Sequence, residues 1–188
     1  MVRKVAMSGC ITVLALVAGC TAGASSPASG RSGHSASAIT AVSSASPCPA
    51  GQTKKFARAL YVTDAGLAAG AFTKWIYAPY TKSAFARGVT GRPGAIAKAA
   101  AASGYVVSQL QEVKASAQSD PALCRLTIGA IDKLTSTVRA IGARAKAGSV
   151  SPAQVTSAAA FLSRLQAASA EAGAAFRAQS VSSLPASD

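Results

Sequence analysis

The chain has little of the chemistry that enzymes commonly use. Its 188 residues include one histidine and six acidic residues, and aromatic residues make up 5% of the total. A Ser-His-Asp triad needs a histidine in the folded part of a protein, whereas His34 lies in a low-complexity segment. One histidine is too few for a histidine-rich zinc site, and six scattered acidic residues leave few pairs of carboxylates for acid–base catalysis. We therefore expect no catalytic residues, no metal and no cofactor, and we predict that the protein is not an enzyme.

Negative charge is scarce and positive charge is abundant. The sequence has 19 Lys and Arg against 6 Asp and Glu, which gives a formal net charge of +13. The cations are spread along the chain without a clustered basic face or a nucleic-acid-binding motif, so we expect no nucleic acid partner. Spread positive charge favours anionic surfaces, and lipid headgroups, an anionic envelope polymer or another envelope protein are the candidate partners. Simple solvation of an alanine-rich surface is the alternative interpretation.

The first residues have the features of an export signal. Arg3 and Lys4 supply positive charge, and residues 11–18 form an apolar run of the length that such signals use. Residues 17–20 read Val-Ala-Gly-Cys. This stretch resembles the lipobox of bacterial lipoproteins, in which an aliphatic residue and two small residues precede an obligatory cysteine. The resemblance implies a diacylglycerol group on the thiol of Cys20 and cleavage just before that residue.

The overall composition fits the same class of protein. Alanine and arginine are frequent and asparagine is absent, so the chain resembles an actinobacterial-type lipoprotein, while the part after the signal resembles no characterised family. The resemblance implies a lipid-anchored location on the outer face of the bacterial cell membrane. Two alternatives stay open: cleavage near Ala22 or Ala24, which would release a secreted protein, and retention of the apolar run as a membrane anchor.

Composition divides the chain into four parts. Residues 1–19 form the signal, and residues 20–47 form a lipidated cysteine followed by a linker of Ser, Ala, Gly and Pro. Such a linker cannot bury enough apolar surface to fold, and its root-mean-square span is on the order of 30 Å. Residues 48–179 form one helical domain, and residues 180–188 form a polar tail.

The helical domain carries the pattern of an all-α, antiparallel four-helix bundle. Apolar residues recur at alternating steps of three and four in the segments 94–117, 121–147 and 151–179, which places them on one stripe of a helix. The stripes are Ile96, Ala99, Ser103, Val106, Leu110, Val113 and Ala117; Cys124, Thr127, Ile131, Leu134, Val138, Ile141 and Ala145; and Val155, Ala158, Leu162, Leu165, Ser169, Ala172 and Phe176.

Local signals mark the ends of the last two helices. Asp120 is a predicted N-cap, and Pro121 suits the first helical position. Gly148 is a predicted stop. The run from Ser151 to Gln154 matches a capping box, in which the glutamine side chain reaches back to the cap.

The first helix is predicted to run from Thr53 to Tyr77 and to end because of Pro79, since proline lacks the N–H that a helix needs. A short helical turn near residues 82–86 and a glycine-rich loop over residues 88–94 are predicted to follow. The predicted buried face of this helix is Phe56, Leu60, Thr63 and Leu67.

Two cysteines remain beyond the signal and the lipidation site. Cys48 precedes the first helix and Cys124 lies in the first turn of the third, and these two helix starts share one end of an up-down-up-down bundle. Export would place both residues in an oxidising compartment, where disulfides persist. We therefore predict a Cys48–Cys124 disulfide, with two unpaired thiols as the alternative.

Aromatic residues gather in one segment, which is the first candidate binding site. Its rings are Phe72, Trp75, Tyr77, Tyr80 and Phe85, and the cations nearby are Lys74, Lys82 and Arg87. Tryptophan and tyrosine beside cations suit stacking on a sugar or anchoring of a protein partner. The alternative is that these rings plug the end of the bundle where the first helix breaks.

Asp64 is the second candidate, because it is the first acidic residue of the chain and sits among small residues. It is either a buried or ligand-binding carboxylate or an ordinary exposed or ion-paired one. Taken together, the sequence predicts a membrane-anchored, non-enzymatic binding or structural module of the envelope. The alternative is a carrier that holds a small apolar or anionic ligand between its helices, beneath the aromatic segment.

Overall fold

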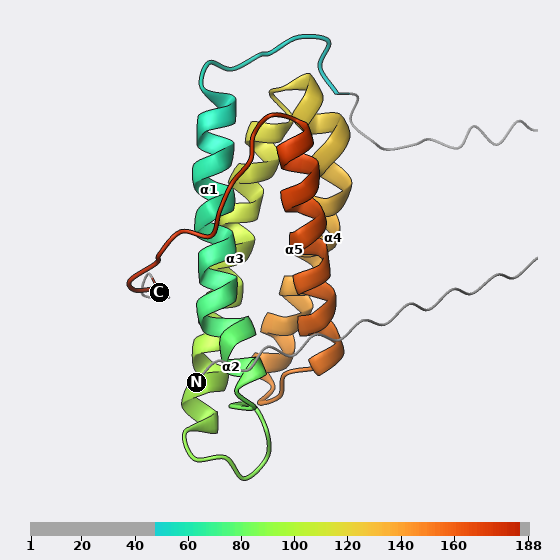
Figure 1. Cartoon of the computed structure of the whole chain (residues 1–188). Coiled ribbons are helices and arrows are strands. Elements are labelled where there is room, and N and C mark those ends of the chain that lie inside the picture. Colours follow the sequence, from blue (N-terminus) through green and yellow to red (C-terminus); the bar gives the residue numbers. More distant parts are fainter. Residues whose placement is uncertain (1–47, 185–188) are drawn as a thin grey trace, which may run out of the picture. The chain divides into compact units, whose positions relative to one another are not determined.

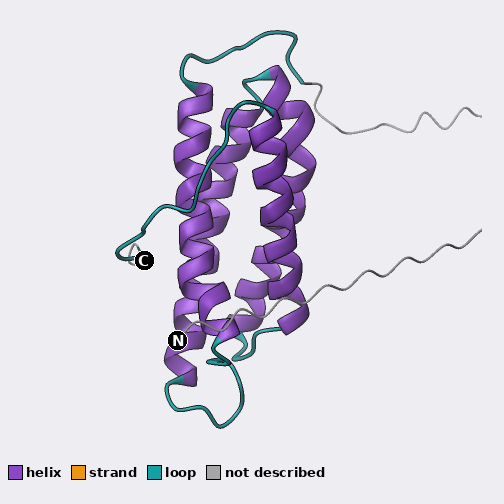
Figure 2. Ribbon diagram, in the orientation of Figure 1, coloured by secondary structure: helices purple, strands orange, loops and turns teal. Residues whose placement is uncertain are grey.

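The structure is a computed structural model in which residues 48–184 are described. These residues form helices and loops, and no strand occurs among them (Figure 2). The helical elements, in chain order, are α1 (Ala57–Phe72), the π-helix η1 (Thr73–Tyr77), α2 (Ala78–Thr81), α3 (Arg92–Ala117), α4 (Pro121–Lys146) and α5 (Pro152–Glu171). The predicted signal, the lipidation site at Cys20 and the linker to residue 47 lie outside the described residues.

Four long helices pack side by side, and each runs antiparallel to the next one along the chain (Figure 1). Helix α3 contacts both α1 and α4, and α4 also contacts α5. The prediction of an all-α, four-helix bundle is confirmed. Every residue of the two stripes predicted for α3 and α4 is buried, because each stripe faces a neighbouring helix along its whole length. Within residues 48–184, no helix has both the length and the apolar character needed to cross a bilayer.

The buried face of α1 differs from the predicted one. Phe56 and Leu60 are 76% and 53% exposed, Thr63 is exposed and Leu67 is only partly buried. The prediction was wrong because it followed the larger apolar side chains, whereas α1 packs mainly through small residues that let helix axes approach closely. The buried face includes Ala57, Tyr61, Ala65, Ala68, Ala69 and Phe72.

Pro79 does not end the first helical segment as predicted. The π-helix η1 follows α1 directly, and α2 then begins at Ala78 with Pro79 in its first turn. Proline lacks the N–H that would bond to the preceding turn, and the hydrogen-bond pattern changes from π to α directly before it, at Ala78. The helical turn expected near residues 82–86 is also wrong: this stretch forms hydrogen-bonded turns, with Ser83 in the left-handed region at φ 55°.

The two predicted N-caps have different outcomes. Asp120 caps α4 as expected, since its Oδ1 accepts from the N–H groups of Ala122 at 2.9 Å and Leu123 at 3.1 Å. The capping box at α5 does not form, because Ser151 makes no side-chain cap bond. The Oε1 atom of Gln154 instead lies buried without a partner.

Glycines end the last two helices. Gly148, the predicted stop, follows α4 at φ 77°. Gly173 ends α5 in the same way at φ 74°, with Ala174 N–H donating to Ser169 O at 2.8 Å. This Schellman arrangement stops the helix at Glu171, short of the predicted extent.

Residues 174–184, here named the C-terminal segment, leave α5 and cross to α1 (Figure 1). The amide of Gln179 donates to the carbonyl of Gly66 at 2.9 Å. The ring of Phe176 meets Tyr61 edge-on, with centroids 6.4 Å apart. Gly70 admits the segment, because a Cβ there would collide with the backbone of Gln179.

The predicted disulfide joins Cys48 to Cys124, with their Cα atoms 5.7 Å apart. It ties the residues before α1 to the first turn of α4. The amide of Thr53 also donates to Ser119 O at 2.9 Å. The start of α1 and the start of α4 therefore lie at one end of the bundle, as the topology requires.

The Asp120 carboxylate gives the fold a pH dependence. The hydrogen bond from Arg58, at 2.7 Å, is the main reason that the pKa of Asp120 lies below its ordinary value of 3.8, with help from the backbone N–H donors. A carboxyl whose pKa is lower in the folded state stabilises the fold above pH 3.8, and this contribution is lost as the pH falls through the folded-state pKa.

We expect Asp120→Ala to lower the free energy of unfolding by about 1 kcal/mol at pH 7, as removal of an N-cap does. The difference from the native chain should shrink as the pH falls below 3.8 and through the lower pKa of the folded-state carboxyl. Urea unfolding followed by circular dichroism at pH 7 and pH 3 measures it. Asp132→Ala is the control, since its pair with Lys114 is exposed and should contribute little. An equal loss in both variants would contradict the cap.

Candidate functional site

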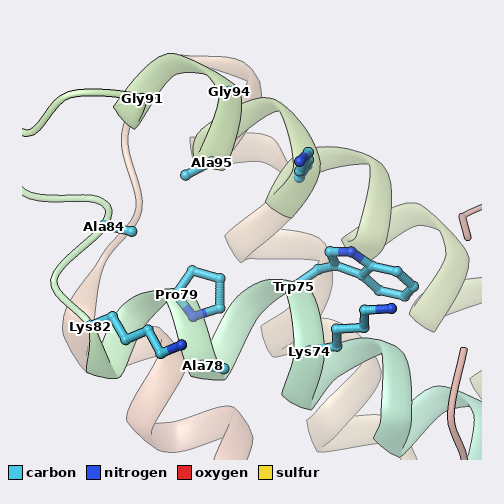
Figure 3. A pocket seen from close by; sticks show the side chains of 10 residues that line it. Lys74, Trp75, Ala78, Pro79, Lys82, Ala84, Gly91, Gly94 and Ala95 are labelled. Carbon is cyan, nitrogen blue, oxygen red and sulfur yellow. The ribbon is translucent and has the colours of Figure 1, made fainter. Parts of the chain in front are cut away.

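A groove lies between η1 and α2 on one side and the first turns of α3 on the other. Its volume is about 450 Å³, and Figure 3 shows Trp75 and Pro79 on one side with Gly91, Gly94 and Ala95 on the other. The lining consists of Lys74, Trp75, Ala78, Pro79, Lys82, Ala84, Gly91, Gly94, Ala95 and Lys98. We name it the lysine groove.

The lysine groove is cationic. Lys74, Lys82 and Lys98 line it, and no acidic residue does. The ion pairs among residues 48–184 involve other cations, Arg58 and Lys114, so no described carboxylate neutralises the three ammonium groups. The groove also abuts the N-terminus of the 26-residue helix α3, whose dipole adds partial positive charge. The electrostatics therefore favour an anionic ligand.

Small residues and the π-helix shape this groove. Gly91 precedes α3 at φ 82°, a backbone conformation that glycine adopts without strain. Apart from neighbouring residues of the same segment, no described atom lies within 4 Å of where a Cβ on Gly91 or Gly94 would be. The side of the groove formed by these glycines is therefore open. On the other wall Trp75 is partly buried, and the Lys74 ammonium lies 4.7 Å from its ring centroid. The ring and the charge are thus presented together.

The structure separates the predicted aromatic residues. Only Trp75 lines the lysine groove. Phe72 is buried and stacks on Tyr77 at 6.3 Å, and Tyr77 in turn lies 6.4 Å from Tyr80. Phe85 is partly buried against the core. The other four rings therefore pack against the bundle or one another, and the groove has a single aromatic wall.

Asp64 does not join the lysine groove. It lies partly buried on α1, and its pKa is above the ordinary value mainly because burial penalises the charged form, with repulsion from Glu112 adding to the shift. A carboxylate so placed offers no counter-charge to the three lysines. Within the described part of the chain, no group of three or more His, Cys, Asp or Glu side chains could hold a metal ion.

One buried polar pair lies in the core and serves the fold. The hydroxyls of Tyr61 and Ser169 are 2.6 Å apart, and Ser169 donates onward to Leu165 O. Burial raises the pKa of Tyr61, so the phenol stays neutral. This pair links α1 to α5.

Lys74 serves both the lysine groove and the C-terminal segment. Its Nζ donates to Val181 O at 2.8 Å while lining the groove. The sequence indicates Lys74 and Lys82 beside the aromatic segment, but nothing in it links Lys98, Gly91 and Gly94 to that segment. Only the antiparallel pairing of α1 with α3 brings these residues to Trp75.

Comparison with protein-family models, with curated proteins and with solved structures gives no match.

Proposed function

We propose that the chain is a lipid-anchored, extracytoplasmic binding module, not an enzyme, and that its lysine groove binds an anionic polymer of the cell envelope. The observation that carries the proposal is the set of three lysines around Trp75 without a carboxylate. The lipobox-like residues 17–20 support the location.

The groove chemistry matches a polymer that bears phosphate or carboxylate groups on a sugar or polyol chain. Ammonium groups form charge-assisted hydrogen bonds with such anions. The apolar face of Trp75 can pack against the C–H groups of the backbone between charges. An open groove can hold one part of a long chain while the rest lies in solvent, whereas an enclosed cavity could not.

A carrier for a small anionic ligand is the alternative. A volume of about 450 Å³ is within the range of small-molecule sites. Ligand length separates the two functions. A carrier would bind free glycerol phosphate with the same affinity as the polymer. A polymer-binding module would bind the polymer more tightly, because several linked units contribute.

The fluorescence of Trp75 tests the proposal, because it is the single tryptophan of the chain. We expect poly(glycerol phosphate) to change the emission of the full chain in detergent. Lys82→Gln with Lys98→Gln should weaken binding roughly tenfold or more, since two charge-assisted contacts are lost. Added salt should weaken it further.

The matched control is Lys133→Gln with Arg144→Gln, which removes the same charge from exposed positions outside the groove. This variant should bind as the native chain does. If both double variants lose affinity equally, net charge rather than the groove is responsible. An emission unchanged by polymer would also count against the proposal.

A further inference from the structure

The tip of α1 presents apolar side chains that the bundle does not use. Phe56 is 76% exposed and Leu60 is 53% exposed. Leu60 lies one helical turn after Phe56, the residue that precedes α1. Both are absent from the hydrophobic core and from the side chains packed against it. The packing of residues 48–184 therefore gives no reason for large apolar groups here.

The backbone at Phe56 reinforces this point. Phe56 precedes α1 in the left-handed region at φ 62°, which is uncommon for a bulky side chain. Its carbonyl accepts the first hydrogen bond of the helix, from Leu60 N–H at 3.0 Å. The conformation thus turns an aromatic ring to the outside of the bundle at a cost that no core contact offsets.

The exposed charges next to Phe56 along the chain are cationic, while Glu171, exposed at the end of α5, lies at the same end of the bundle. Lys54 and Lys55 come directly before Phe56, and both are exposed. Arg58 is paired with Asp120, and the first acidic residue along α1 is Asp64, two turns beyond Phe56. Exposed lysines beside an aromatic ring and a leucine are the composition that binds the surface of an anionic bilayer.

The position of the tip in the chain identifies the same partner. Residues 1–47 precede the bundle and enter it at Cys48, and the disulfide to Cys124 holds this entry at the end where α1 begins. A chain anchored in lipid through residues before Cys48 therefore brings this end of the bundle to the bilayer at high effective concentration.

We propose that Lys54, Lys55, Phe56 and Leu60 form a docking tip that rests on anionic lipid, with the phenyl ring and leucine in the interfacial region. This proposal rests on the membrane-anchoring part of the proposed function and is independent of the lysine groove. Sedimentation with vesicles tests the anchoring, and the fluorescence of a tryptophan at position 56 tests the docking.

The experiment places a fluorophore at the tip. The full chain carrying Phe56→Trp and Trp75→Phe is bound to phosphatidylglycerol vesicles with brominated acyl chains. Tryptophan at position 56 should shift its emission to shorter wavelength and be quenched. The native chain is the control, because Trp75 lies near the opposite end of the helices and should stay unquenched.

Charge variants complete the test. Lys54→Gln with Lys55→Gln should lower the docking equilibrium by roughly fivefold per lysine, and phosphatidylcholine vesicles should also reduce quenching. Unquenched emission at position 56 in sedimented vesicles would overturn the docking tip, and so would equal quenching of Trp75. A blue shift that grows with protein concentration without lipid would overturn it too, in favour of a second copy of the chain. Failure to sediment at all would remove the anchoring on which the proposal depends.

Discussion

Replacing Cys48 and Cys124 by alanine is expected to lower the free energy of unfolding by about 4 kcal/mol. The disulfide closes a loop with a sequence separation of 76, and the chain-entropy account assigns such loops a stabilisation of this size. This loss is a large part of the total stability of the bundle, because many buried positions are alanine and each buries less apolar area than a leucine would.

Urea unfolding of the full chain, followed by circular dichroism, measures this effect. The native chain under reducing conditions is the matched control, and its midpoint should move to that of the double alanine variant. A native midpoint that reduction leaves unchanged would mean that the bundle does not depend on the bridge. The variant should keep its helical signal below the transition, since the buried stripes of α3 and α4 are intact.

Gly70→Val is expected to release the C-terminal segment from α1. Any Cβ at this position would collide with the backbone of Gln179, and the helix interior is the more rigid of the two partners. Release would expose Phe176 and Val181, which are now buried, and would cost about 3 kcal/mol. The amide of Gln179 would lose its acceptor on Gly66 and become open to solvent.

Amide hydrogen exchange at Gln179 and the thermal midpoint together measure this release. Gly104→Val is the matched control, because Gly104 lies in a helix interior and, apart from its own helix backbone and chain neighbours, no described atom lies within 4 Å of its Cβ position. The control should leave exchange at Gln179 slow. Slow exchange in both variants would show that the segment shifts along α1 without leaving it.

The buried faces of α3 and α4 could be predicted from the sequence, whereas that of α1 could not, and the difference has a physical reason. In α3 and α4 the branched residues Val106, Leu110, Ile131 and Val138 all lie on the buried stripe. Leu126 lies off it and is exposed, but the spacing of the larger set identifies the stripe. On α1 two stripes compete, and the face with small residues is the buried one. Hydrophobicity ranks phenylalanine and leucine above alanine, whereas close packing of helices favours the small side chains.

The candidate site was foreseen only in part. Trp75 and its neighbouring lysines stand out in a chain with few aromatic residues, but Lys98 looks like any solvated lysine until α3 is placed beside η1. The path of the C-terminal segment was also missed. Gly173 was the available signal for the end of α5, and it was outweighed by the apolar spacing that continues to Phe176.

The two ends of the bundle differ in what they present, and this has a consequence for spacing. Gly91 and Gly94 of the lysine groove lie at the start of α3, whereas the end of α3 lies beside Ser119 and the disulfide. A helix of 26 residues is about 39 Å long. In the arrangement we propose, the docking tip and the lysine groove lie at opposite ends of the helices. The number of helical turns then determines how far from the bilayer the envelope polymer is bound.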